Sequence, residues 1–184
     1  MSGTGGPPRD GTMPRDGTMP RLTHIDEHGK ARMVDVTGKD VSRRVAEARC
    51  RVLTGADVTA VLAGQPGGHD LVEMARSAGV QAAKLTSTLI PLCHPLLIDR
   101  SVVEVAVVDG GVAVRAVTTV AGRTGVEIEA LTACAVASLV LFQAFLAEDP
   151  ETSVEELTVW YKSGGRTGTW VRGEPADGGR QLEA

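Results

Sequence analysis

The stretch 84–96, which reads K-L-T-S-T-L-I-P-L-C-H-P-L, constrains the fold more than any other part of this chain. A helix that reaches about Leu89 cannot continue through Pro91, because a proline pushes the residue before it out of the helical region. Residues 92–95 are therefore predicted to be extended, and His94 is held rigidly beside a second proline. An imidazole fixed in this way can titrate near neutral pH or accept one defined hydrogen bond. The alternative interpretation is a buried structural histidine.

Composition limits the class of protein. A chain of 184 residues is long enough for one domain with tails. Aromatic residues make up only 3%, so the core must be built from valine, alanine and leucine. A net charge of -4 without any run of lysine or arginine argues against nucleic acid as a partner. The three cysteines, Cys50, Cys93 and Cys134, lack metal-binding spacing, which predicts a reducing, cytoplasmic location and no metal site.

The longest apolar stretch, residues 130–147, is close to the lower length limit for crossing a bilayer of about 30 Å. It contains polar residues such as Thr132 and Gln143 and lacks basic flanks. We therefore predict a helix that is buried on nearly all sides rather than a membrane span. No cationic segment followed by an apolar run opens the chain, so no secretory signal is predicted.

Patterning divides the chain into a disordered leader over 1–21, a folded domain over 22–172 and a flexible tail over 173–184. Apolar periodicity predicts helices over 58–63, 71–89 and 130–147. Alternation predicts strands over 32–36, 44–52, 101–108, 112–120 and 157–161. Helices grouped against an antiparallel sheet indicate an α+β fold, with ferredoxin-like topology as the natural form. The apolar helix has no polar stripe, so another surface must cover it, and we expect an oligomer.

Two glutamates precede the apolar helix. Glu127 and Glu129 flank one apolar residue, so in extended geometry both carboxylates would point the same way. The positive end of the helix dipole would keep both of them ionised. Beside His94, such a pair could divide the roles of acid and base. The alternative interpretation is helix capping with exposed charge.

Cationic residues are sparse, which makes their positions informative. After Lys39 the only lysines are Lys84, near the histidine turn, and Lys162, which opens a glycine-rich loop. Arg123 and Arg166 lie in two similar loops, G-R-T-G-V and G-R-T-G-T. Exposed backbone N–H groups and a fixed cation together favour phosphate binding, although the spacing is not that of a P-loop. The alternative is that each loop is a solvated turn.

Several motifs occur in one order along the chain: T-H-I-D, M-V-D-V, A-G-V-Q-A-A-K, L-I-P-L-C-H-P-L, G-V-E-I-E-A-L-T-A and K-S-G-G-R-T-G. Over residues 23–169 the chain resembles the MoaC family of molybdenum-cofactor biosynthesis proteins. The resemblance implies a ferredoxin-like protomer, a hexamer built as a trimer of dimers, and active sites at subunit interfaces. It also implies a substrate, the cyclised GTP 3',8-cyclo-7,8-dihydro-GTP made by a radical-SAM partner. Family members rearrange it to cyclic pyranopterin monophosphate and release pyrophosphate.

Carried over position by position, the resemblance assigns substrate contacts to the histidine turn, to the start of the apolar helix and to three basic residues: Leu92, Cys93, His94, Glu127, Ile128, Lys84, Lys162 and Arg44. It implies catalytic roles for His94, Glu127, Glu129 and the position of Gln143. No cofactor is implied, and a role for magnesium is left open.

Three positions depart from the family pattern. The family has a lysine in the loop before the long helix, where this chain has Gly68 followed by His69. It also has an Asp-x-x-Lys pair on the apolar helix, where this chain has Gln143 and Leu146. Glutamine cannot exchange a proton as aspartate does, and leucine has neither charge nor donor. Losses of this kind typically lower a rate by about 10² to 10⁴ each.

Three functions remain open at this point. The first is a lyase that performs the family reaction or a weakened form of it. The second is a diverged paralogue that acts on a related radical-SAM product, with His69 and Gln143 taking over the missing roles. The third is a non-catalytic nucleotide-binding or scaffold subunit.

Overall fold

The computed structural model describes residues 24–26, 28–63, 70–165 and 168–173, and the chain forms two compact units, 1–34 and 35–184. In the first unit, Ile25 and Ala31 form an isolated antiparallel bridge. The Asp26 carboxylate closes the turn between them, because it accepts hydrogen bonds from the backbone N–H groups of His28 (2.9 Å) and Lys30 (2.8 Å).

The strand predicted over 32–36 is wrong, since none of these residues belongs to a strand. The Asp35 carboxylate instead accepts hydrogen bonds from the backbone N–H (2.9 Å) and the hydroxyl (2.7 Å) of Thr37, which forms a local turn. The predicted leader over 1–21 lies outside the described residues, and so does the predicted tail from residue 174 onward.

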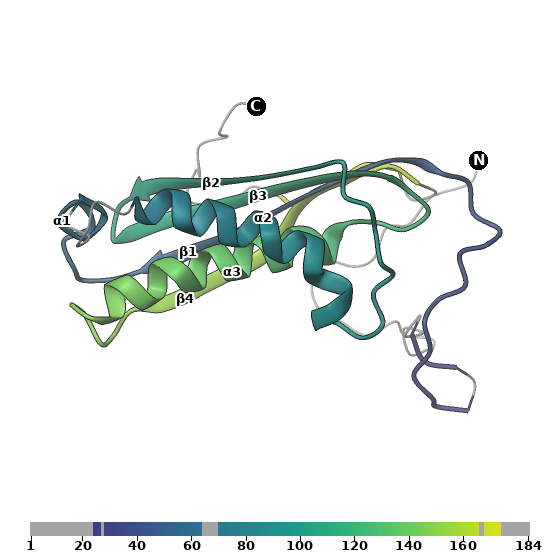
Figure 1. Cartoon of the computed structure of the whole chain (residues 1–184), viewed down its shortest axis with the longest axis horizontal. Helices are drawn as coiled ribbons and strands as arrows, with labels where there is room; N and C mark the ends of the chain where they lie inside the picture. The colour runs from purple at the N-terminus through teal and green to yellow at the C-terminus, as the bar shows by residue number, and fades with distance from the viewer. Residues whose placement is uncertain (1–23, 27, 64–69, 166–167, 174–184) are drawn as a thin grey trace. The chain divides into compact units, whose positions relative to one another are not determined.

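The second unit is built on one five-stranded antiparallel sheet with the order β2-β3-β1-β4-β5 (Figure 1). The strands are β1 (Ser42–Leu53), β2 (Arg100–Val108), β3 (Gly111–Gly122), β4 (Ser153–Ser163) and β5 (Trp170–Val171). The predicted α+β class with an antiparallel sheet is confirmed. The sequence pattern missed β5, because a strand of two residues is too short to show alternation.

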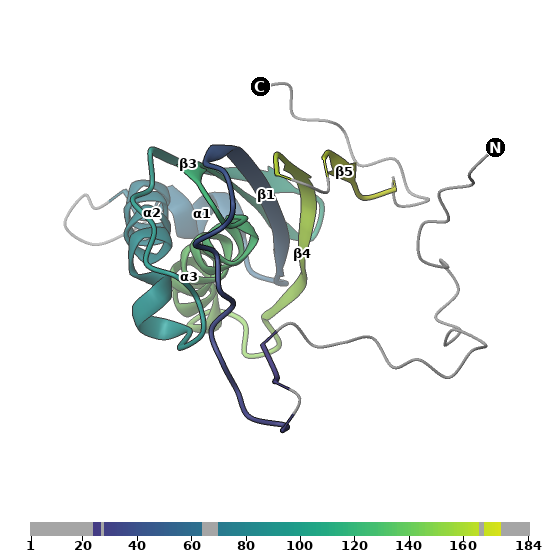
Figure 2. The same cartoon turned by 90° about the vertical axis from the view of Figure 1, so that its right-hand side faces the viewer.

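Three helices accompany the sheet, namely α1 (Val58–Ala63), α2 (Leu71–Leu89) and α3 (Glu127–Leu146). Figures 1 and 2 show α2 and α3 side by side on one face of the sheet. Asp70 caps α2, since its carboxylate accepts hydrogen bonds from the N–H groups of Val72 (2.9 Å) and Glu73 (3.1 Å). The helix ends where predicted, because Ile90 before the proline is extended, with φ -115° and ψ 102°.

The core is made of small side chains, as the low aromatic content predicts. Alanine and valine dominate its buried residues, and Phe145 and Leu141 are the largest side chains that are fully buried. Small residues let the two long helices approach closely. A methyl group at Gly79 of α2 would lie only 2.7 Å from the carbonyl oxygen of Ala133 in α3.

The prediction that the apolar helix is buried on nearly all sides is wrong. α3 packs one face on the sheet and another on α2, but a third face is outward, where Leu139 is 56% exposed. Within the described residues, α3 is the one helix that is long and apolar enough to cross a membrane by length and composition. Its buried residues, Ala130 and Ala137 among them, belong to the core described above.

The strand register defines two ends of the sheet. At the first, called the glycine-loop end, β1, β2 and α3 begin and β3 and β4 finish, with the pairs Ser42↔Gly122 and Val45↔Ser163. At the second, called the hairpin end, the pair Val108↔Gly111 closes the β2–β3 turn and α3 finishes. The sequence thus brings segments that lie far apart along the chain to each end.

Candidate active site

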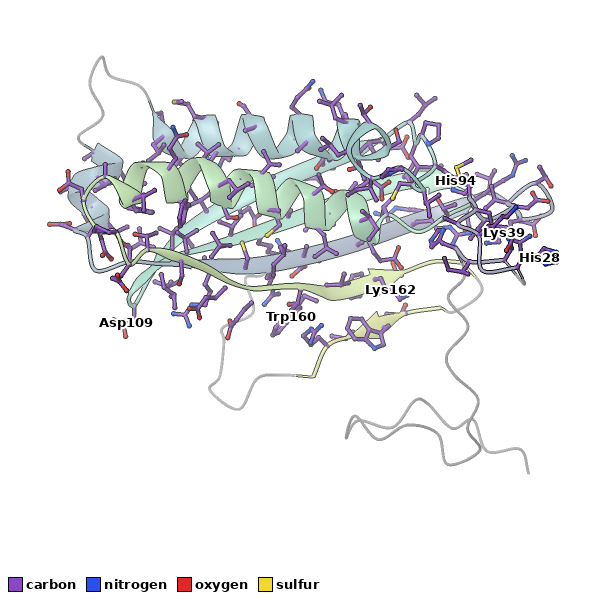
Figure 3. The ribbon with its side chains drawn as sticks, turned by 90° about the horizontal axis from the view of Figure 1, so that it is seen from below. His28, Lys39, His94, Asp109, Trp160 and Lys162 are labelled. Carbon is purple, nitrogen blue, oxygen red and sulfur yellow. The ribbon has the colours of Figure 1, made fainter. Side chains whose placement is uncertain are left out.

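The histidine segment forms a turn at the glycine-loop end. The backbone N–H of Cys93 donates to the carbonyl oxygen of Ile90 at 3.0 Å, so Leu92 lies inside a turn and not in the extended segment that was predicted. Pro91 suits this geometry because its fixed φ favours the second position of a β-turn. His94 follows the turn and is half-buried. Figure 3 shows His94, Lys39 and Lys162 toward one end of the sheet and Asp109 toward the other.

Glu127 and Glu129 lie in the first turn of α3 and not in an extended segment. Two residues along a helix correspond to a rotation of about 200°, so the carboxylates point to different sides. The Glu127 carboxylate forms an ion pair with the Lys162 ammonium, with 3.0 Å between Oε1 and Nζ. Both side chains are about one-third exposed, at 29% and 35%. The prediction that both glutamates point the same way is therefore wrong.

Glu129 is buried, with only 4% of its surface exposed. Burial raises the pKa of its carboxyl from 4.5 to about 7, and the neighbouring Glu127 carboxylate adds to the rise, whereas its own backbone N–H opposes it. The prediction that the helix dipole keeps both carboxylates ionised is therefore wrong for Glu129. Loss of solvation outweighs the dipole, and a group with this pKa can donate or accept a proton near neutral pH.

The charge of Glu129, at the start of α3, acts on Cys93 in the histidine turn. Burial raises the pKa of the Cys93 thiol, and the charge of Glu129 raises it further. A charge acts in this way only when it lies near the group that it perturbs. Cys93, the residue before His94, is therefore a neighbour of the buried carboxyl.

Arg44 is held between two glycine-rich loops. It lies near the start of β1, and its Nε and Nη2 atoms donate to the carbonyl oxygens of Gly122 (3.1 Å) and Arg123 (3.2 Å). On its other side lies Gly165, where a methyl group would collide with Nη1 of Arg44 and where φ is +71°, a conformation that favours glycine. The cation is therefore fixed by carbonyl groups that do not neutralise it.

Gly125 leaves room for the Glu127 side chain, as Gly165 does for Arg44. A methyl group at Gly125 would collide with the Glu127 carboxylate, so that side chain would have to shift from the position in which it meets Lys162. Sequence reasoning assigned the glycines of these loops to phosphate binding and missed that they make room for charged side chains. The recurring G-R-T-G pattern was the available signal. Arg166 in the second loop lies outside the described residues, and Arg123 donates through Nε to the carbonyl oxygen of Lys39 at 3.0 Å.

Three other predicted site residues form no side-chain hydrogen bond or ion pair with this cluster in the part of the chain that the structure describes. Lys84 is exposed on α2, two turns before the histidine turn, and Ile128 is 40% exposed on α3. Gln143 is exposed at the hairpin end, sixteen residues after Glu127, which corresponds to about 24 Å along the helix axis. In one protomer Gln143 cannot act on the same atoms as Glu129. Gly68 and His69 lie outside the described residues.

One hollow lies away from this cluster. It has a volume of about 570 Å³ at the hairpin end, and Thr54, Gly55 and Asp149 help to line it. The Asp149 carboxylate is occupied there, because it accepts hydrogen bonds from Gly55 N–H (2.6 Å) and the Thr54 hydroxyl (3.3 Å). Within the described ranges, no group of three or more His, Cys, Asp or Glu side chains could hold a metal ion.

Comparison with known proteins gives one consistent result. The model of the MoaC family matches residues 33–165. A cyclic pyranopterin monophosphate synthase from Nocardioides sp. is 49% identical over 157 residues, which cover 83% of this chain and 96% of the relative. The protein of that name from Streptomyces coelicolor is 44% identical over 173 residues, which cover 93% and 95%. The Novosphingobium aromaticivorans protein of that name is 45% identical, covering 83% and 98%. This chain belongs to the MoaC family.

Proposed function

We propose that this protein is a cytoplasmic lyase of the cyclic pyranopterin monophosphate synthase type in molybdenum-cofactor biosynthesis. It converts 3',8-cyclo-7,8-dihydro-GTP, supplied by a radical-SAM GTP cyclase, to cyclic pyranopterin monophosphate and pyrophosphate. The observation that carries the proposal is the buried Glu129, with a pKa of about 7, next to the histidine turn. Family membership supports the substrate class.

The reaction needs proton transfer and anion binding, and the cluster has groups for both. Glu129 takes the role of acid and base, because it changes protonation near neutral pH. Glu127 and His94 orient the nucleotide and share the proton chemistry. Lys162 and Arg44 hold the triphosphate as pyrophosphate leaves, since fixed cations stabilise the charge that develops there.

The remaining predicted contacts complete the binding surface. Leu92, Cys93 and Ile128 contact the nucleotide from the two segments that meet at Glu129. Lys84, which is exposed and has no ion pair with any residue that the structure describes, contributes a further cation to the phosphates.

We also propose that the protomer is ferredoxin-like and assembles as a hexamer, a trimer of dimers. The strand order β2-β3-β1-β4 with α2 and α3 on one face supports the topology. The exposed apolar residues of α3, such as Leu139, support assembly. In this proposal Gln143 belongs to the active site of another protomer, because it lies about 24 Å from Glu127 in its own.

A second function is favoured by the exposed pair Gln143 and Leu146. Neither side chain can exchange a proton at neutral pH, so the step that the family assigns to Asp-x-x-Lys cannot proceed unchanged. A diverged paralogue would use this surface for a related radical-SAM product. A non-catalytic subunit would bind the nucleotide tightly without turnover.

Product analysis with the cyclised nucleotide tests the proposal. The purified protein is incubated beside the Nocardioides relative, and the pterin product and pyrophosphate are quantified. The lyase proposal expects both products from the wild-type chain and a higher rate from the double variant Gln143→Asp, Leu146→Lys. Ala147→Lys is the matched control, because it adds a lysine to the exposed residue that ends the same helix, outside the family pattern. Absence of product from the wild type and from the double variant, while the relative turns over, would refute the proposal.

A further inference from the structure

Two buried cysteines touch each other in the core of the sheet-helix unit. Cys50 lies in the middle of β1 and Cys134 in the middle of α3, and they are 2% and 0% exposed. Their sulfur atoms are 3.4 Å apart, and the Cys134 thiol is placed to donate to Cys50 Sγ. Both are free thiols, as is Cys93. Nothing in the proposed lyase reaction uses this pair.

We propose that Cys50 and Cys134 are a peroxide-reactive thiol pair that forms a reversible intramolecular disulfide. A disulfide bond is about 2.05 Å long, so the two sulfurs need to approach by about 1.4 Å. Side-chain rotation of the two cysteines must close this gap. Unlike an isolated buried cysteine, each member of this pair has a second thiol beside it that can react with its oxidised form.

The hydrogen bond assigns different roles to the two sulfurs. The hydrogen bond from Cys134 lowers the pKa of the Cys50 thiol, although burial opposes this. The same hydrogen bond raises the pKa of the Cys134 thiol, and burial raises it further. The thiolate is the nucleophile in thiol oxidation. We take Cys50, whose sulfur accepts the hydrogen bond from the Cys134 thiol, as the attacking residue, and Cys134 as the residue that resolves the intermediate.

The reaction balances with hydrogen peroxide as the only oxidant. The Cys50 thiolate attacks one peroxide oxygen, the O–O bond breaks, and the departing hydroxide takes up the proton that Cys50 had released, which leaves a sulfenic acid and one water. The Cys134 sulfur then attacks the sulfenic sulfur. A second water leaves with the sulfenic oxygen and the Cys134 proton, and the disulfide remains. Two thiols lose two electrons in total, and one peroxide is reduced to two waters.

Burial limits the size of the oxidant that can reach the two sulfurs. Both sulfurs are enclosed, and the Val114 carbonyl oxygen lies 3.5 Å from Cys134 Sγ. A small hydroperoxide can reach this place through ordinary fluctuations of the core, but a bulky disulfide such as oxidised glutathione cannot. Cys93 is an internal comparison, since it is more exposed than the other two cysteines and burial raises its pKa.

The product would link the two elements that position the candidate site. β1 carries Arg44 and α3 carries Glu127 and Glu129, and the cross-link would join positions 84 residues apart in sequence. Closing a loop of this length restricts the unfolded chain strongly. Oxidation is therefore expected to raise the melting temperature by about 5 to 10 °C.

The test uses the full-length wild-type chain in its native state. The protein is treated with hydrogen peroxide, unreacted thiols are blocked by alkylation, and intact mass and peptide maps are measured before and after dithiothreitol. The proposal expects loss of two thiols and of the mass of two hydrogen atoms, one peptide containing Cys50 joined to Cys134, a higher melting temperature, and full reversal. Cys50→Ala and Cys134→Ala should each abolish the linked peptide.

Two results would overturn the proposal. One is that Cys50 and Cys134 stay reduced at peroxide doses that oxidise Cys93. The other is oxidation of either residue to a sulfinic acid without any linked peptide. Both readouts come from the wild-type protein, so they decide the question even if an alanine variant fails to fold.

Discussion

Charged and polar side chains have different surroundings at the two ends of the sheet. At the glycine-loop end, Glu129 is buried, and Arg44 is fixed between loops whose glycines leave room for it. At the hairpin end, Gln143 is exposed and Asp149 stabilises a turn. Backbone hydrogen bonds lower the pKa of the Asp149 carboxyl, whereas burial raises the pKa of Glu129 until it can transfer a proton near neutral pH.

The two ends also differ in where the resemblance implies a departure from the family pattern. Gln143 and Leu146 both lie at the hairpin end, near the finish of α3. The residues that match the family pattern at the start of α3 and in the histidine turn lie at the other end. The implied departures that the structure describes therefore lie at one end of the protomer, and the buried carboxyl with its neighbours lies at the other.

The largest effect should follow from Glu129→Gln. Glutamine keeps the shape of the side chain but cannot exchange a proton, so the rate of pyrophosphate release should fall by about 10² to 10⁴. Steady-state kinetics with the cyclised nucleotide measures this. Glu148→Gln, at the hairpin end, makes the same chemical change and should leave the rate within about twofold. Equal losses in the two variants would remove the distinction between the ends.

The pH dependence of stability should change by a smaller amount. Because the folded pKa of Glu129 is raised from 4.5 to about 7, the folded state binds more protons than the unfolded state between these values, and stability falls as pH rises through that window. The full term is about 3 kcal/mol. Glu129→Gln should therefore be more stable than wild type at pH 8 by about that amount relative to pH 4. Urea unfolding at several pH values measures the difference, and parallel curves for the two proteins would contradict it.

A glycine substitution tests how the first end is built. In Gly125→Ala the new methyl group displaces the Glu127 carboxylate from Lys162, and turnover should fall by about 10-fold through misplacement of the site. Gly38→Ala is the matched control, because nothing lies near the methyl group that it adds. Kinetics and thermal unfolding of both variants decide the matter. Unchanged turnover in Gly125→Ala would mean that the ion pair has no part in catalysis.

The smallest effect concerns the cap of α2, at the hairpin end. Asp70→Ala removes the cap of α2 and should lower the free energy of unfolding by about 1 kcal/mol. Asp70→Asn keeps an acceptor and should be close to wild type. Turnover per folded molecule should not change in either variant. A large loss of turnover in Asp70→Ala would show that the two ends are coupled.

The regular elements were predictable because their sequence periods are long. The helix that ends near Leu89 and the hairpin strands on either side of Gly110 and Gly111 were predicted close to their observed limits. The strand predicted over 32–36 was wrong, because a local hydrogen bond of the Asp35 side chain competes with strand pairing. The outward face of α3 was not predicted either, because the sequence of a uniformly apolar helix does not reveal which face has a neighbour.

The site residues were identified from motifs, but their electrostatics were not. Whether Val126 ends a strand or precedes a helix decides where the carboxylates of Glu127 and Glu129 point, and the sequence permits both. The raised pKa of Glu129 depends on burial by segments far away in the chain, which no local pattern contains. The space that Gly125 leaves for Glu127 likewise becomes visible only in three dimensions.

The central claim is that the glycine-loop end holds a carboxyl that titrates near neutral pH. Carbon-13 NMR of the glutamate carboxyl groups, assigned with the Glu129→Gln variant, measures this directly across a pH series. The account predicts a midpoint of about 7 for Glu129. A midpoint near 4.5, the ordinary value for a glutamate, would contradict it.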